Sequence, residues 1–501
     1  MRRHAVSLLV ALSFAACDAA PPAPPPPKAT AAAASAAATT YAEVPITTSN
    51  DAARQAFEKG RDLQLNTREA EAIEELKKAV AADPGFSFAR AWLGYLEIGE
   101  EGTAELARAM DGRQKLPEPE RLSIEELAAL RAGEHDKARE LARTIVKLAP
   151  FDWRAQLDLG NRLYDDRKYD EAVVHFGKAA AFGPKTPAVY NALGYGYLQQ
   201  HKVDAAVAAF RKYAELEPDE PNALDSLGEA LLDAGKFAEA EVEFKKAADM
   251  NFSFAWDGVA QTRFLRGDWA GGLDANAHAK EAALRPIDKI DSDANGVWAL
   301  LAHGDDAEAE KRIDALEKDA QAAKYDEAYA VAAVYRGIAA AAPGKEQAGV
   351  KSMQDALDRA AKAKLPGSAT ARVERLALSM KVVLETLAAS PDVEKTAAQI
   401  FAIAAKAPDD VDLASLAALG RGAATLVKGD AKAAVVELAR CVDQDYVCRY
   451  ELLLAEEKVP DPTSAEVTKE RILAMNLRDA PYLWIRAKAA ATGTAAAVEK
   501  K

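Results

Sequence analysis

Histidine and cysteine are the side chains most often used for metal and nucleophilic chemistry, and both are scarce in this sequence. The six histidines occur singly, and no HExxH motif or Cys/His cluster with zinc-ligand spacing is present. The sequence also lacks a GxSxG nucleophile motif and a phosphate-binding loop with its lysine. It therefore predicts no metal, no cofactor and no catalytic residues, and a protein that is not an enzyme.

Two of the three cysteines are close enough in sequence to react with each other. Cys441 ends one predicted helix and Cys448 opens the next, so a tight turn between them can bring the two thiols within bonding range. In an exported chain the pair would form a disulfide that staples the turn. The alternative is that both side chains are small buried hydrophobes. The sequence leaves both interpretations open.

The third cysteine follows an apolar run near the start of the chain. Two arginines precede Ala5–Ala16, a run too short to span a bilayer as a helix, and the stretch FAAC then ends at Cys17. This stretch resembles the lipobox of bacterial lipoproteins, which implies that Cys17 receives a lipid and that residues 1–16 are removed as a signal peptide. The alternative is an ordinary secretory signal cut after Ala15.

The lipobox resemblance implies a lipid-anchored protein of the bacterial cell envelope that faces the periplasm or the cell surface. Which membrane holds the anchor stays open. Residues 17–48 are expected to be the lipid-attachment cysteine followed by a disordered, Pro/Ala-rich tether, because the clustered prolines of PPAPPPPK favour an extended chain and cannot build a core. No other stretch is apolar enough for a membrane span, so the lipid is the expected membrane contact.

The composition of the chain favours helices and an acidic surface. It is rich in alanine, glutamate and lysine, and its formal net charge is −14. Nucleic-acid binding proteins present a basic surface, so the charge argues against a nucleic-acid partner. An acidic surface fits either a basic protein partner or simple solubility.

A repeat of 34 residues organises these helices. Equivalent positions carry a small residue, an alanine, a bulky residue and a closing proline, found respectively at Gly60, Gly94, Gly160, Gly194 and Gly228; Ala72, Ala138, Ala172, Ala206 and Ala240; Leu76, Phe176, Phe210 and Phe244; and Pro84, Pro150, Pro184 and Pro218. Small residues allow two helices to approach closely, bulky residues fill the space to the next unit, and proline ends the second helix.

This pattern resembles the tetratricopeptide repeat. The resemblance implies an all-α, superhelical solenoid of stacked antiparallel helix hairpins, roughly eleven to twelve of them. We expect the clearest repeats over residues 49–286, degenerate repeats over 287–476, and a capping helix with a disordered tail over 477–501. A break near residues 284–292 would divide the solenoid into two lobes.

The family resemblance also indicates which residues would line the inner groove. Mapped onto three successive units, the groove positions are Arg154, Leu157, Asn161, Tyr164 and Asp165; Asn191, Tyr195 and Gln199; and Asn222, Asp225, Glu229 and Asp233. Amide side chains can bond a peptide backbone, tyrosines can hold its side chains, and the acidic residues would attract a basic segment. The lysine and arginine set with which some family members bind a terminal carboxylate is missing. The alternative is an ordinary polar helix face.

The leading hypothesis is a membrane-anchored scaffold that binds a protein or peptide in this groove and supports assembly of an envelope complex. A second hypothesis is a sensory or regulatory repeat array that controls an envelope enzyme or transporter. A third, an enzyme of unrecognised type acting on cell-wall material, has no motif in its favour.

Overall fold

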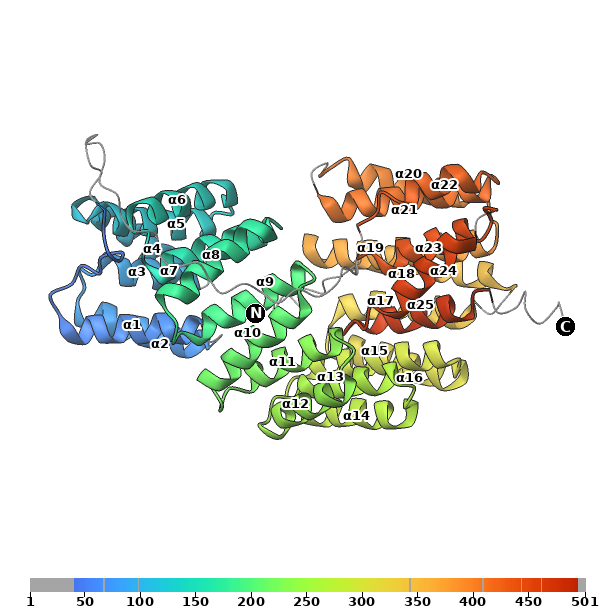
Figure 1. Cartoon of the computed structure of the whole chain (residues 1–501), viewed down its shortest axis with the longest axis horizontal. Helices are drawn as coiled ribbons and strands as arrows, with labels where there is room; N and C mark the ends of the chain where they lie inside the picture. The colour runs from blue at the N-terminus through green and yellow to red at the C-terminus, as the bar shows by residue number, and fades with distance from the viewer. Residues whose placement is uncertain are drawn as a thin grey trace. The chain divides into compact units, whose positions relative to one another are not determined.

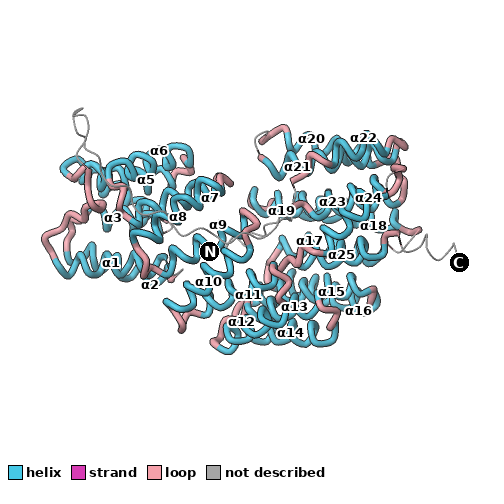
Figure 2. The backbone as a smooth tube through the Cα atoms, in the orientation of Figure 1, coloured by secondary structure: helices cyan, strands magenta, loops and turns pink. Residues whose placement is uncertain are grey.

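The computed structural model describes residues 40–493, except residues 66, 67, 98, 342, 343, 408, 409, 443 and 461. Within this part of the chain every regular element is a helix and loops make the connections (Figure 2), so the all-α prediction is confirmed. The predicted signal peptide, Cys17 and residues 18–39 of the predicted tether lie outside the described residues.

The described residues form two compact units, which we call the N-terminal unit (40–218) and the C-terminal unit (219–493). The helices of the N-terminal unit pair as antiparallel hairpins in chain order (Figure 1). They are α1 (Asp51–Leu65), α2 (Glu69–Ala82), α3 (Ser87–Leu96), α4 (Glu100–Gly112), α5 (Glu118–Arg131), α6 (His135–Leu148), α7 (Trp153–Asp165), α8 (Tyr169–Phe182), α9 (Pro187–Gln199) and α10 (Val203–Leu216), with a 3-10 turn at Arg113–Lys115.

The C-terminal unit continues the same construction with longer and less regular hairpins. Its helices are α11 (Pro221–Asp233), α12 (Phe237–Asp249), α13 (Ala255–Leu265), α14 (Trp269–Ala282), α15 (Pro286–His303), α16 (Asp306–Ala322), α17 (Asp326–Ala340), α18 (Glu346–Ala363), α19 (Gly367–Leu387), α20 (Val393–Ala404), α21 (Val411–Val427), α22 (Ala431–Leu438), α23 (Tyr446–Glu456), α24 (Pro462–Leu473) and α25 (Ala480–Ala491). The predicted break near residues 284–292 falls inside this unit, where α14 packs against α15. The division between units lies instead after Pro218.

The repeated small and bulky residues pack as their spacing predicts. The five repeat alanines are all fully buried: Ala72, Ala138, Ala172, Ala206 and Ala240. A Cβ atom on Gly194 would lie 2.6 Å from the ring of Phe210, which is closer than real atoms approach. The hairpins α7–α8, α9–α10 and α11–α12 therefore close because a phenylalanine ring of the second helix fits over a glycine of the first.

Residues 40–48 correct one expectation, because they belong to the fold and not to the tether. The Tyr41 N–H donates to the Leu148 carbonyl at 2.7 Å, and the Val44 N–H donates to Asp152 Oδ2 at 2.7 Å. Val44 and Ile46 pack against the buried core of the first hairpins. This stretch contains one proline and two β-branched apolar side chains, so it can bury surface that the proline-rich stretch before it cannot.

The last helix also differs from its predicted role. We expected residues 477–501 to cap the end of the stack and trail into a tail, and residues 494–501 lie outside the described part. Helix α25 instead contacts α15 and α13 as well as its neighbours α23 and α24. The chain thus folds back from the end of the C-terminal unit onto that unit's early hairpins.

Candidate partner-binding groove

The predicted groove residues of the N-terminal unit do not share one environment. Arg154 Nη2 lies 2.9 Å from Asp62 Oδ1, and its guanidinium stacks on Trp153 at 4.2 Å from the ring centre. Asn161 is half-buried and lines the same cavity as Arg154. Leu157 corrects our prediction, because it is only 2% exposed and packs in the core, where a partner cannot reach it.

At the end of α7, two predicted residues remain at the surface. The Tyr164 ring packs edge-on against Tyr169 at 5.2 Å between centres. The Asp165 side chain is 67% exposed, and its Oδ2 lies 3.6 Å from Arg162 Nη1. This end of the helix therefore offers a partner an aromatic edge and a carboxylate.

Helix α9 presents the amide side chains that the sequence singled out. Asn191 is half-buried, and its Oδ1 has no hydrogen-bond partner. Gln199 is 8% exposed, and its Oε1 also has none. Tyr195 lies between them in sequence and packs edge-on against Phe210 at 5.0 Å. Because a buried amide oxygen without a donor costs free energy, this face is suited to receive donors from another chain.

In the C-terminal unit, the acidic residues of α11 face a basic group of the chain itself. Arg478 Nη1 lies 2.8 Å from Asp225 Oδ2, and Arg478 Nη2 donates to the Phe254 carbonyl at 2.5 Å. The guanidinium also lies 4.9 Å from the centre of the Phe244 ring. Asp225 is 8% exposed. We predicted that Asp225 would attract a partner's basic segment, and the structure corrects this, because Asp225 is already paired within the chain.

Burial and neighbouring charges set the proton affinities at this contact. Burial alone would lower the pKa of Arg478, but the Asp225 carboxylate outweighs it and raises that pKa, with Glu229 and Asp257 adding to the effect. Burial raises the pKa of Asp233 well above its usual value, and the charge of Glu229 adds to this. The charge of Glu229 thus acts on both neighbours: it raises the pKa of Arg478 and that of Asp233.

The loop residues 475–479, which we call the return segment, contact α11, α13 and α23. Gln261 Nε2 donates to the Leu477 carbonyl at 2.7 Å, and Tyr446 Oη donates to Asp479 Oδ2 at 2.9 Å. Asn222, the remaining predicted residue, is half-buried near the start of α11, where its backbone N–H donates to Glu220 Oε1 at 3.1 Å. Sequence reasoning missed Arg478 and Gln261, because neither occupies a position that the repeat marks.

The sequence also missed a cavity of about 90 Å³ in the N-terminal unit. The first helices of four successive hairpins, α1, α3, α5 and α7, all contribute to its wall. Arg61, Glu126 and Arg162 are its charged members beside Arg154, Asp152 and Asp158. Burial raises the pKa of Glu126 to about 8, and the nearby Asp158 adds to this. Burial lowers the pKa of Arg61 to about 10.

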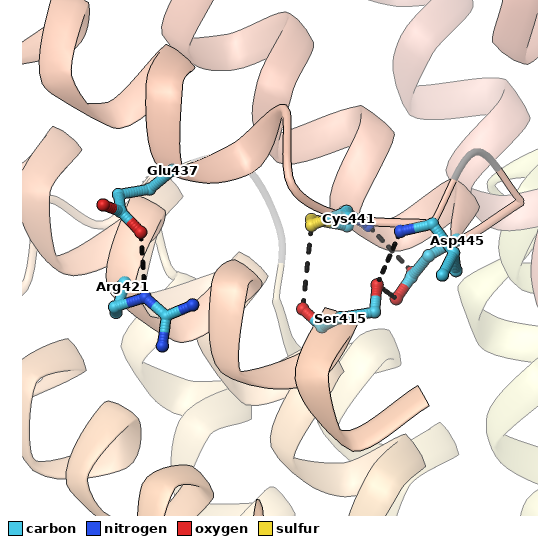
Figure 3. Close-up of a disulfide and its surroundings, with 7 residues drawn as sticks. Ser415, Arg421, Glu437, Cys441 and Asp445 are labelled. Carbon is cyan, nitrogen blue, oxygen red and sulfur yellow. Dashed lines mark hydrogen bonds and ion pairs between the residues drawn. A yellow bond between two sulfur atoms is a disulfide. The ribbon is translucent and has the colours of Figure 1, made fainter. Parts of the chain in front are cut away.

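A disulfide joins Cys441 to Cys448, with 6.3 Å between their Cα atoms. Figure 3 shows its surroundings: Ser415 Oγ donates to Asp445 Oδ2 at 2.9 Å, and Cys441 Sγ lies 3.6 Å from the Ser415 carbonyl oxygen. Asp445 Oδ1 in turn accepts from the Cys448 N–H at 3.0 Å. The disulfide and the Asp445 side chain, which caps the start of α23, together hold α22 and α23 in place at this turn.

No feature of the described residues indicates catalysis or membrane insertion. These residues contain no group of His, Cys, Asp or Glu side chains arranged to hold a metal ion. In the same part of the chain, no helix has both the length and the apolar character needed to cross a bilayer.

Stacked helix hairpins with an inner polar face define an α-solenoid of the kind that binds other proteins. Residues 127–187 and 191–251 match the tetratricopeptide repeat family model. These residues therefore carry tetratricopeptide repeats, and proteins built from this repeat are in general non-catalytic protein-interaction scaffolds.

Solved structures of MamA and of a tetratricopeptide repeat protein match parts of this chain. MamA is 18% identical, with a TM-score of 0.30, and the match covers 31% of this chain and 93% of that one. A tetratricopeptide repeat protein from Parabacteroides merdae is 16% identical, with a TM-score of 0.40 and coverage of 52% and 98%. MamA from Desulfovibrio magneticus is 16% identical, with a TM-score of 0.24 and coverage of 40% and 95%. No curated protein sequence matches this chain.

Proposed function

We propose that the protein is a scaffold, lipid-anchored at Cys17 in the bacterial cell envelope, that holds an extended segment of a partner protein along the inner faces of α7 and α9. The return segment is the observation that carries this proposal. In the C-terminal unit, the Gln261 amide holds the backbone of the return segment, and the Asp225 carboxylate holds its basic side chain.

The residues of α7 and α9 supply equivalent groups. The Asn191 amide lacks a partner for its oxygen, and rotation of the terminal amide brings that oxygen toward an incoming backbone N–H. Tyr195 offers an aromatic surface, and the exposed Asp165 offers a carboxylate to a basic side chain. The preferred partner segment is therefore extended and carries at least one lysine or arginine.

The test is site-specific photo-crosslinking in intact envelopes. A benzophenone amino acid at Tyr195 should capture a defined protein, and Asn191→Lys should abolish that adduct because it places a like charge against the basic segment. The matched control is Gln354→Lys, which changes another half-buried amide, on α18 of the C-terminal unit, and should leave the adduct unchanged. Equal adducts in both variants, or none in the parent, would refute the assignment of the groove.

A further inference from the structure

Arg61 is the feature of the N-terminal unit that its packing leaves unexplained. Its side chain is inside the fold, since the residue is only 8% exposed, and it lines the cavity described above. The guanidinium carbon lies 5.4 Å from the Phe57 ring centre, 5.5 Å from that of Phe88 and 5.4 Å from that of Trp92. Such ring contacts stabilise the cation but leave the N–H groups at its edge without acceptors.

Among the described residues, no hydrogen bond joins Arg61 to Asp152, Asp158 or Glu126, the carboxylates of the cavity wall. Asp152 already accepts hydrogen bonds from the Val44 and Arg154 backbone N–H groups, each at 2.7 Å. Arg162 Nε lies 3.6 Å from Glu126 Oε1, which is too long for a hydrogen bond. Burying an arginine without a hydrogen-bonded counter-ion costs free energy. A negatively charged molecule in the cavity would offset this cost.

The other unsatisfied groups around the cavity point to the same chemistry. Trp92 Nε1, Arg154 Nε and Arg162 Nε are buried and have no hydrogen-bond partner, and all three are donors. An occupant that offers only acceptor atoms would satisfy them.

The balance of charge also favours an anion. Three arginines, Arg61, Arg154 and Arg162, line the cavity. Against them stand Asp152, Asp158 and Glu126, and burial raises the pKa of Glu126 to about 8, so this carboxyl is mainly protonated at pH 7. Outside the wall, Arg154 pairs with Asp62 and Arg162 with Asp165, so Arg61 is the guanidinium of the wall that has no ion-pair partner among the described residues.

The size and lining of the cavity select among anions. Its volume is about 90 Å³, and a cavity of roughly 150 Å³ is known to hold benzene with its six heavy atoms, so about four heavy atoms fit here. Apolar side chains complete the wall, among them Val44, Leu127 and Ile145. A fully hydrated tetrahedral anion would leave this apolar side without contacts, whereas a short monocarboxylate has one charged end and one apolar end.

We propose that this cavity binds the carboxylate of a small monocarboxylic acid, with Arg61 as its ion-pair partner and the Trp92 indole as an additional donor. The acid would connect α1, α3 and α7 through one buried anion, which gives the N-terminal unit a ligand-dependent element. This inference goes beyond the scaffold function and does not rest on it, because α9 and the proposed partner segment take no part.

The direct test follows the indole N–H resonances of the full-length chain labelled with 15N at tryptophan. Acetate and propionate should shift the Trp92 resonance in a saturable manner, with a Kd of roughly 0.05–5 mM for a ligand of this size. The Trp92 resonance is identified by its loss in Trp92→Phe. Resonances of tryptophans in the C-terminal unit should not move.

Calorimetry on variants then assigns the contacts. Arg61→Met should weaken acetate binding by at least about tenfold, because it removes the buried ion pair. Trp92→Phe keeps an aromatic side chain at this position but removes the indole N–H, so it should weaken acetate binding by about tenfold. If Arg61→Met does not fold, this variant tests the proposed contact instead. Arg143→Met is the control, since Arg143 pairs with Glu171 at 3.1 Å on the surface of the same unit; it should bind acetate as the parent does.

Three results would overturn the proposal. No Trp92 shift at acetate concentrations on the order of 50 mM would mean that water alone fills the cavity. Equal shifts with chloride or sulfate at matched ionic strength would mean that the site takes any anion. A shift with a carboxylate-bearing peptide but not with free acetate or propionate would make the cavity part of the partner groove.

Discussion

The contact between Arg478 and Asp225 gives the sharpest quantitative prediction. Replacing Arg478 by methionine keeps much of its apolar stem but leaves the buried carboxylate of Asp225 without its cation, and it removes a positive charge near the half-buried Asp257. Removing one partner of a buried ion pair typically costs about 3–5 kcal/mol. We expect Arg478→Met to lower the free energy of unfolding of the C-terminal unit by about 3 kcal/mol, since both side chains are less than one fifth exposed.

Removing the acidic partner of the pair should lower the free energy of unfolding by a smaller amount. Asp225→Asn leaves Arg478 next to Glu229 and Asp257, which still attract it, so we expect a loss of about 1–2 kcal/mol. The double variant should lose less than the sum of the two, with a coupling of about 1–2 kcal/mol.

The assay is urea unfolding followed by tryptophan fluorescence. Four of the six tryptophans lie in the C-terminal unit, so a background with Trp92→Phe and Trp153→Phe reports on that unit alone. Arg440→Met is the control, because Arg440 is a 59% exposed arginine paired at the surface, and its loss should change stability by less than about 0.5 kcal/mol. Strict additivity of the Arg478 and Asp225 variants would refute the reasoning.

Three further predictions concern other parts of the chain. Burial raises the pKa of Glu451 to about 8, above about 4.3 in the unfolded chain, so the contribution of this group to stability is greatest below pH 4.3 and falls by roughly 4–5 kcal/mol as the pH rises to 8. Glu451→Gln should flatten this dependence in urea titrations at pH 5 and pH 8, and parallel curves would contradict it. Ala206→Leu, at a fully buried repeat position, should cost about 1–3 kcal/mol, and an unchanged melting temperature would show that the repeat register is wrong. Cys17→Ser should move the protein from the membrane to the soluble fraction on cell fractionation, and continued membrane association would exclude lipid at Cys17 as the anchor.

The packing within hairpins could be predicted from the sequence because it is local and periodic. The interval that separates Gly194 from Phe210 recurs between Gly228 and Phe244, and each pair meets within one hairpin. Burial of the repeat alanines follows from the same spacing. A 34-residue period therefore carries enough information to fix the helix pairs and the order in which they stack.

Contacts that cross many repeats could not be predicted in this way. Arg478 and Asp225 are 253 residues apart, and no motif links the short segment NLRD to the inner face of α11. Leu157 shows a related limit. A groove position transferred from the family ignores local curvature, and here the helices close over that side chain. Nor does any repeat position mark Arg61, whose surroundings come from α1 and α3 together.

The return segment has a consequence for how the protein is made. Most solenoid hairpins can fold as soon as their neighbours have left the ribosome, because they contact only those neighbours. The inner face of α11 must wait for residue 478, and 253 residues take about 13–50 s at roughly 5–20 residues per second. During this interval Asp225 has no counter-ion from its own chain. Early hairpins of the C-terminal unit are thus completed by residues synthesised about 250 positions later, and a product stalled before residue 478 would expose an acidic face that Arg478 otherwise covers.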